Sequence, residues 1–227
     1  MPSAQDVLIT GATGYIGSRL VVEIARRGHT VRAFARQSSQ GRVPPGAIAI
    51  VGDVLDADSI AGALQPADCL VHLVGTPHPS PSKAAEFRRV DLASAEAAIS
   101  AAVRVGVAHF VYVSVAHPAP VMQAYAAARV EAEQRLADAR LTATILRPWY
   151  VLGPGHRWPI LLLPLYAVAS LVPAFRDGAQ RLGLVTVTQM VRALAHAIDH
   201  PPPAGTMQIV DVPAIRARGR RVALSGT

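Results

Sequence analysis

The sequence predicts a doubly wound, parallel α/β fold followed by a small C-terminal lobe. Apolar, strand-like runs alternate with amphipathic, helix-like stretches between residues 7 and 146. A glycine-rich turn joins the first strand to the first helix. The run 69–74 is apolar except for His72, as expected of a strand that is covered on both faces.

The elements follow one another in the order that this fold requires. Strands are expected at residues 7–10, 30–35, 47–51, 69–74, 110–114 and 143–146, with a last strand at 207–210. Helices are expected at residues 15–27, 57–64, 83–105, 121–139 and 188–197. We therefore place one domain at 1–154, a small lobe packed on it at 155–213, and a basic, disordered tail at 214–227.

Composition narrows the class of protein. With 51% hydrophobic and 16% charged residues in 227, the chain is long enough for one domain with a sizeable core. The net charge of +7 comes almost entirely from dispersed arginines, and aromatic residues make up 5%, which argues against a nucleic-acid interface. The single cysteine, Cys69, allows no internal disulfide. The first strand begins close to Met1 and leaves no room for a signal peptide, so a cytoplasmic protein is expected.

The apolar stretch at residues 158–175 has no charged residue. Three prolines interrupt it, and it is short for a membrane span, so a span is not expected. Three interpretations stay open: a buried helix pair, the apolar wall of a substrate pocket, or a patch that rests on a membrane or a partner.

The glycine-rich turn is the most informative motif. Gly11 permits the tight turn, Gly14 lets the backbone approach a pyrophosphate, and Gly17 lets the helix pack on the strand. The N-terminus of the following helix faces the phosphate charge. The strand before the motif and the helix after it favour a dinucleotide site over a turn that binds nothing.

Several stretches in the same order resemble the short-chain dehydrogenase/reductase superfamily, and more narrowly its atypical, epimerase/dehydratase-like branch. They are residues 7–17, Val51-Gly52-Asp53-Val54, Val71-His72-Leu73, residues 110–114 and Ile145-Leu146-Arg147-Pro148. Proteins similar to the dehydrogenase-like accessory subunit of respiratory complex I and to nitrogen-metabolite-repressor-like cofactor sensors share these features, and some of them only bind the cofactor. The resemblance implies a Rossmann domain whose nucleotide contacts include Thr13, Tyr15, Ile16, Asp53, Val54, Gly75 and Thr76.

The second strand predicts which dinucleotide is bound. A site that prefers NAD(H) usually has a carboxylate near the end of this strand, but Ala35 occupies that place and Arg36 follows it. A guanidinium can pair with a 2′-phosphate. We therefore expect NADP(H) to be preferred over NAD(H); the alternative is that Arg36 is a solvated loop residue.

The family's reaction centre is matched with one departure. It pairs a tyrosine with a lysine four residues later and adds a serine from the preceding strand end; here these are Tyr125, Arg129 and Ser114. Arginine keeps a cation one turn from Tyr125, but its planar fork does not replace a lysine at a demanding site. Tyr125 is therefore either an acid/base or a residue that packs beside the nicotinamide.

Two functions follow from these residues. The first is an NADP(H)-dependent oxidoreductase acting on a small apolar carbonyl or alkene, with Arg129 tuning Tyr125 and contacting the ribose and Ser114 orienting the substrate. The second is a non-catalytic NADP(H)-binding sensor or assembly protein. No metal site is expected, because no Cys/His cluster has ligand spacing. The substrate and the oligomeric state are not predicted.

Overall fold

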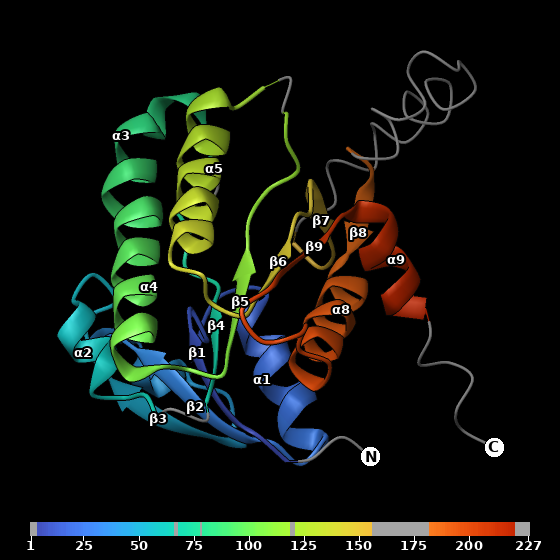
Figure 1. The fold of residues 1–227 in the computed structure, drawn as a ribbon. Coiled ribbons are helices and arrows are strands. Elements are labelled where there is room, and N and C mark those ends of the chain that lie inside the picture. Colours follow the sequence, from blue (N-terminus) through green and yellow to red (C-terminus); the bar gives the residue numbers. More distant parts are fainter. Residues whose placement is uncertain (1–3, 66–67, 78, 119–120, 156–181, 221–227) are drawn as a thin grey trace.

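A central parallel sheet lies between two layers of helices in the computed structural model, which describes residues 4–65, 68–77, 79–118, 121–155 and 182–220 (Figure 1). Its seven strands have the order β3-β2-β1-β4-β5-β6-β9, and every neighbouring pair is parallel. The strands are β1 (Asp6–Thr10), β2 (Thr30–Ala35), β3 (Ala47–Val51), β4 (Cys69–His72), β5 (His109–Val113), β6 (Ala143–Leu146) and β9 (Met207–Val210). A separate parallel pair consists of β7 (Tyr150–Leu152) and β8 (Leu184–Thr186).

The helices divide between the two faces of the sheet (Figure 1). One layer contains α1 (Gly17–Arg26), α8 (Val187–Asp199) and α9 (Val212–Arg220). The other contains α2 (Ala57–Ala61), α4 (Ala93–Val105) and α5 (Gln123–Asp138). Short segments complete the connections: η1 (Gln37–Arg42), η2 (Pro81–Lys83), α3 (Ala84–Glu86) and the π-helical η3 (Phe87–Leu92).

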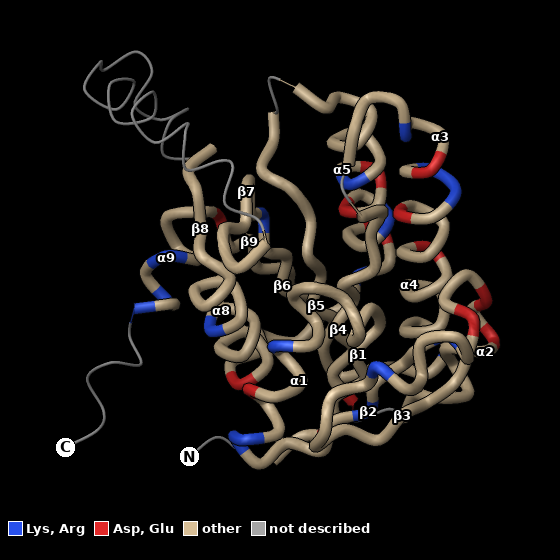
Figure 2. The backbone as a smooth tube through the Cα atoms, turned by 180° about the vertical axis from the view of Figure 1, so that it is seen from behind, with Lys and Arg blue, Asp and Glu red and all other residues tan. Residues whose placement is uncertain are grey.

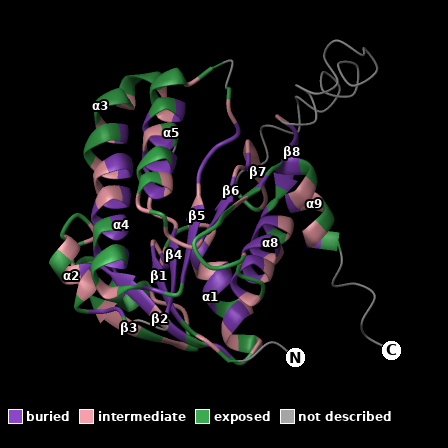
Figure 3. Ribbon diagram, viewed as in Figure 1, coloured by how far each residue is buried: buried purple, intermediate pink, exposed green. Residues whose placement is uncertain are grey.

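Successive side chains of the central strands point to opposite faces of the sheet and so contribute to the hydrophobic core on each face. In β1, Val7 and Ile9 pack into the cluster that contains α1 and α8, whereas Leu8 packs into the cluster that contains α2, α4 and α5. All three side chains are fully buried, and the inner strands are buried along most of their length (Figure 3). Covering both faces explains why these strands are almost continuously apolar in sequence.

This architecture confirms the predicted doubly wound α/β fold. Strands β2 and β3 are added on one side of β1, and β4, β5 and β6 are added on the other side. The strand order therefore reverses between β1 and β4. In open parallel sheets, ligands bind at the carboxyl ends of the strands where the order reverses. The carboxyl ends of β1 and β4 therefore locate the candidate crevice.

The C-terminal part departs from the prediction. The tail expected from residue 214 is wrong over 214–220, because α9 forms there and buries Val212 and Ile215 completely. Asp211 caps this helix by accepting a hydrogen bond from the amide of Ala214 at 3.0 Å. A short helix with three arginines shows little apolar periodicity, which is why the sequence favoured disorder. Residues 221–227 lie outside the described part.

The described residues of the expected lobe are built into the main body. Helix α8 packs against α1, and β9 extends the central sheet beside β6. A capping box starts α8, in which Thr186 and Gln189 each bind the other's backbone amide. The 1–154 domain and the 155–213 lobe thus share one core wherever the structure describes them.

Basic and acidic residues are spread over both helix layers, and three arginines lie at alternate positions in α9 (Figure 2). Within the described residues, no helix has the length and apolar character needed to cross a lipid bilayer. The apolar stretch 158–175 lies outside the described residues, so its three interpretations are untested.

Candidate functional site: the carboxyl ends of the sheet

The glycine-rich turn leaves β1 directly above the end of β4. Gly11 has a φ of +75°, and a Cβ there would lie 2.9 Å from the carbonyl carbon of Leu73. A Cβ on Gly17 would lie 2.2 Å from the carbonyl oxygen of Gly11, so a side chain there would push α1 away from the turn. Both positions require glycine for a close backbone approach.

Unpaired amides line this turn at the start of α1. Among the described residues, the backbone N–H groups of Thr13, Ile16 and Gly17 have no hydrogen-bond acceptor, and Gly14 is exposed. Such amides at a helix N-terminus, together with the helix dipole, form a cradle for an anion. The residues present therefore fit a dinucleotide pyrophosphate.

Tyr15 closes one side of the turn. The Arg19 guanidinium lies 4.4 Å from its ring centroid and donates a hydrogen bond to its carbonyl oxygen at 2.6 Å. A Cβ on Gly153 would lie 2.1 Å from the Tyr15 hydroxyl oxygen, so the chain after β7 touches this ring. The contact from Gly153 was not predicted from the sequence, because it joins positions far apart in the chain.

The other predicted nucleotide contacts lie at the ends of β2, β3 and β4. Arg36 is exposed directly after β2, and no described residue forms an ion pair with it. Asp53 is exposed after β3, where its Oδ1 accepts a hydrogen bond from the Leu55 amide at 2.9 Å; Val54 is half-buried beside it. Gly75 and Thr76 follow β4 at the same edge of the sheet. The structure thus brings these residues to one edge.

Ser114 follows β5 with an unsatisfied hydroxyl. Its amide donates to the Leu146 carbonyl at 2.8 Å, but its buried Oγ has no hydrogen-bond partner among the described residues. An unpaired polar atom costs free energy when buried, so it is unusual unless a ligand completes it. This hydroxyl is available to a ligand at the carboxyl end of β5.

Tyr125 lies one turn from Arg129 on α5, as the spacing predicts. The Tyr125 ring is half-buried and packs edge-on against Phe87, with centroids 5.2 Å apart. The Arg129 guanidinium lies 5.2 Å from the same ring centroid, within the range of a cation–π contact. Burial alone lowers the pKa of Arg129, but Tyr125, Tyr112 and Asp91 raise it, and its net pKa is above the ordinary value.

Arg129 itself is turned inward. Its side chain is only 5% exposed, and its Nη2 pairs with Asp91 Oδ1 at 2.7 Å. Its remaining terminal donors bind three oxygens: the carbonyls of Val74 and Val113 and the Tyr112 hydroxyl. In this arrangement no terminal N–H of Arg129 is left for the ribose contact expected from the sequence. Asp91, which sequence reasoning missed, explains the difference.

His72, the one polar residue of the apolar run 69–74, is fully buried in β4. Its Nδ1 lies 2.8 Å from Thr10 Oγ1, and its Nε2 lies 3.4 Å from Ser94 Oγ. Burial and the charge of Arg129 lower the pKa of His72 to about 3. A lowered pKa favours the neutral ring at pH 7.

A hollow of about 370 Å³ opens beside Tyr125. Its lining combines Tyr125 and Phe87 with the segment that starts α5. Among the described residues, those that line it are all uncharged: Pro81, Phe87, Val121, Met122, Gln123, Ala124 and Tyr125. This surface suits an uncharged, largely apolar group.

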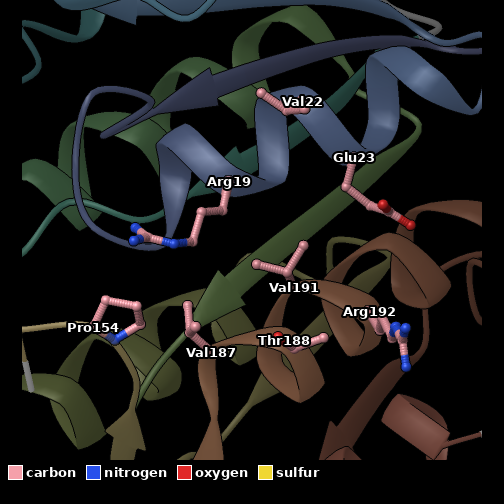
Figure 4. Close-up of a pocket in the computed structure, with 8 residues that line it drawn as sticks. All are labelled: Arg19, Val22, Glu23, Pro154, Val187, Thr188, Val191 and Arg192. Atoms are coloured by element: carbon pink, nitrogen blue, oxygen red, sulfur yellow. The ribbon is translucent and has the colours of Figure 1, made fainter. Parts of the chain in front are cut away.

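A second hollow of similar volume lies in the surface groove between α1 and α8 (Figure 4). Three valines, Val22, Val187 and Val191, form its apolar part, while Arg19 lies toward one end and Arg192 toward the other (Figure 4). It runs along the two helices rather than over the strand ends, so we do not assign it to the nucleotide.

Comparison with known families agrees with this geometry. The NAD(P)H-binding family model matches residues 11–156, which include the glycine-rich turn, Ser114, Tyr125 and Arg129.

Individual proteins also match this chain in sequence. Divinyl chlorophyllide a 8-vinyl-reductase from Oryza sativa subsp. indica is 33% identical over 162 residues, covering 65% of this chain and 40% of the relative. Ceramide reductase from Caulobacter vibrioides is 27% identical over 211 residues, covering 91% of this chain and 64% of the relative. The chain thus spans less than two thirds of the length of each of these two relatives.

Solved structures share the fold. DesIV, a dTDP-glucose 4,6-dehydratase from Streptomyces venezuelae with NAD and TYD bound, superposes with a TM-score of 0.67 at 21% identity, covering 90% of this chain and 75% of that chain. At this identity the likeness concerns the architecture alone.

Proposed function

Because this chain belongs to the NAD(P)H-binding family of the short-chain dehydrogenase/reductase superfamily, we propose that it is an NADP(H)-dependent oxidoreductase acting on a small, apolar carbonyl or alkene. The observation that carries the proposal is the combination of unpaired amides at the start of α1 with an unsatisfied Ser114 hydroxyl after β5. Both lie at the carboxyl ends of the strands, where this fold binds its ligands.

The glycine-rich turn would hold the nucleotide. The amides of Thr13, Ile16 and Gly17 would donate to the pyrophosphate, and the α1 dipole would favour its negative charge. Asp53 and Val54 would border the adenine, and Gly75 and Thr76 would underlie the ribose. A bound nicotinamide supplies hydride transfer.

The end of β2 supports a preference for NADP(H). Arg36 is exposed there without an ion-pair partner in the described residues, and no acid occupies the end of this strand. A guanidinium attracts a 2′-phosphate, whereas a carboxylate at this place would repel it.

Two hydroxyls would handle the substrate. Ser114 Oγ would donate a hydrogen bond to a carbonyl oxygen and so satisfy itself. Tyr125 lies beside the uncharged hollow and would deliver or accept the proton. Arg129 would act on Tyr125 through its charge at the ring face rather than by touching the ribose.

The uncharged lining of the hollow supports an apolar substrate. The two relatives described above are named as a vinyl-reductase and a ceramide reductase, which supports a reductase as the class of enzyme. The substrate of this chain is proposed at the level of its class.

Calorimetry and turnover test the proposal together. The wild-type chain should bind NADPH, and it should oxidise NADPH in the presence of at least one member of a panel of apolar ketones, aldehydes and enones. Tyr125→Phe should lower turnover at least about a hundredfold, the usual scale of acid/base catalysis, with NADPH binding unchanged. Absence of NADPH binding would refute the nucleotide site.

A non-catalytic NADP(H)-binding sensor is the second candidate. The inward-turned Arg129 favours it, because the cation that normally assists the tyrosine is committed to Asp91. NADPH binding without turnover on the whole panel, together with a protein complex whose stability changes with NADPH, would support the sensor over the enzyme.

A further inference from the structure

A buried ion pair joins η3 and α5, which pack against each other on one face of the sheet. Asp91 in η3 is fully buried, Arg129 in α5 is 4% exposed, and their Oδ1 and Nη2 atoms are 2.7 Å apart. A buried pair is strongly destabilised when one partner is removed, because the other charge is left uncompensated. The backbone segments that hydrogen-bond to such a pair are therefore held in a fixed position relative to the two helices.

Its further contacts are the ends of β4 and β5. Arg129 binds the carbonyl oxygens of Val74 and Val113, each at 3.2 Å. The second oxygen of Asp91 accepts from the Thr76 amide at 2.9 Å and from the Thr76 hydroxyl at 2.5 Å. We call Asp91, Arg129 and these contacts the Asp91–Arg129 clamp.

Gly75 lies directly against the clamp. A Cβ on Gly75 would be 2.4 Å from Arg129 Nη2 and 3.4 Å from Asp91 Oδ1. The φ of Gly75 is outside the left-handed region, so its backbone conformation does not by itself require glycine. Glycine is needed here because the guanidinium occupies the space of a side chain.

We propose that Asp91 and Arg129 are positioning residues, which hold the Gly75–Thr76 backbone in the place that nucleotide binding requires without touching the nucleotide. This inference rests on the proposed function for the nucleotide itself. The segment after β4 borders the point where the strand order reverses, so a displacement of Gly75 and Thr76 changes the crevice directly.

The geometry makes arginine and lysine unequal at position 129. The planar fork reaches one carboxylate, two carbonyls and one hydroxyl in different directions. A lysine ammonium is a single point charge and does not reproduce that fork. The family's usual lysine is therefore expected to impair this chain rather than improve it.

The first test compares the clamp with a similar ion pair elsewhere. Asp68 is fully buried and directly precedes β4, at the end of the strand opposite to the candidate crevice. It pairs with Arg32 of β2, so Asp68→Asn is the matched control. Asp91→Asn and Arg129→Lys should weaken NADPH binding about tenfold in calorimetry below the melting temperature, the effect of about one lost hydrogen bond. Asp68→Asn should lower the melting temperature but leave the NADPH dissociation constant within about twofold.

Equal effects of Asp91→Asn and Asp68→Asn on the dissociation constant would overturn the positioning role. If single variants do not fold, the double variant Asp91→Asn/Arg129→Met removes both charges together and serves in their place. It should also bind NADPH about tenfold more weakly than the wild type.

The second test needs no nucleotide. Gly75→Ala should lower the melting temperature by about 3 °C or more in the wild type and by less than about 1 °C in the Asp91→Asn/Arg129→Met background, where the guanidinium is absent. Equal losses in both backgrounds would overturn the clamp. If the wild type binds no NADPH, the proposed function fails and the positioning role with it, whereas the thermal coupling still shows whether Arg129 imposes the glycine.

Discussion

Replacing Arg36 by alanine is expected to weaken NADPH binding while leaving NADH binding nearly unchanged. The guanidinium stands exposed after β2, where the 2′-phosphate of NADPH would lie. Hydrogen bonds to charged groups contribute about 1.5–3 kcal/mol, and the lower half of that range applies at an exposed site that water screens. A loss of about 1.5–2 kcal/mol corresponds to a dissociation constant about 10- to 30-fold higher.

Isothermal calorimetry with NADPH and with NADH measures this difference directly. Arg42→Ala is a suitable control, because Arg42 is also an exposed arginine in η1 but already donates to Ser39 Oγ at 2.7 Å. Raising the salt concentration should reduce the effect of Arg36→Ala, since salt screens exposed charges. An equal loss of affinity for NADPH and NADH would refute the pairing of Arg36 with the 2′-phosphate.

Three further outcomes are expected. Tyr125→Phe should reduce turnover at least about a hundredfold and spare NADPH binding in calorimetry; unchanged turnover would remove this hydroxyl from the reaction. Gly17→Ala should abolish NADPH binding and lower the melting temperature, because the new Cβ would meet a carbonyl oxygen at 2.2 Å, whereas Gly41→Ala, with no atom within 4 Å, should change neither. Burial lowers the pKa of His72 to about 3 and that of His109 to about 4, so below pH 6.5 the unfolded chain binds protons that the folded chain does not. Stability should therefore fall as pH falls from 6.5 toward 4, by up to about 1.4 kcal/mol per pH unit for each histidine. Urea unfolding at pH 7, 6 and 5 should show a smaller loss in His72→Gln, and an identical pH dependence in that variant would contradict the assignment.

The fold was predictable because its signals are local. The apolar runs at residues 7–9 of β1 and 69–71 of β4 and the glycine-rich turn each lie within a few consecutive residues. Inner parallel strands are buried on both faces, and so they are almost continuously apolar in sequence. Helix α9 was missed because only Val212, Ile215 and Gly219 of its residues are buried, and its three arginines interrupt the apolar pattern. Strands β7 and β8 were missed because three residues are too few to show a period.

Residues of the candidate site could be predicted only where they belong to a recognisable sequence motif. The glycine-rich turn and the four-residue spacing from Tyr125 to Arg129 follow known patterns, so both could be recognised in the sequence. Asp91 carries no such pattern: it is one acid within a long predicted helix, and only the π-helical turn of η3 and the packing of α5 place it against Arg129. The direction of the Arg129 side chain therefore needed a structure.

The contact between Gly153 and Tyr15 limits how this chain can be divided. The match to the family model ends at residue 156, yet α8 packs against α1, and β9 extends the sheet beside β6. A chain cut after Pro154 would lose the α8 part of the apolar cluster that also contains Ile9, Val21 and Ile24. The glycine-rich turn therefore shares one folding unit with α8 and β9. Nucleotide affinity should be sensitive to substitutions in these elements, although they lie many residues after the turn.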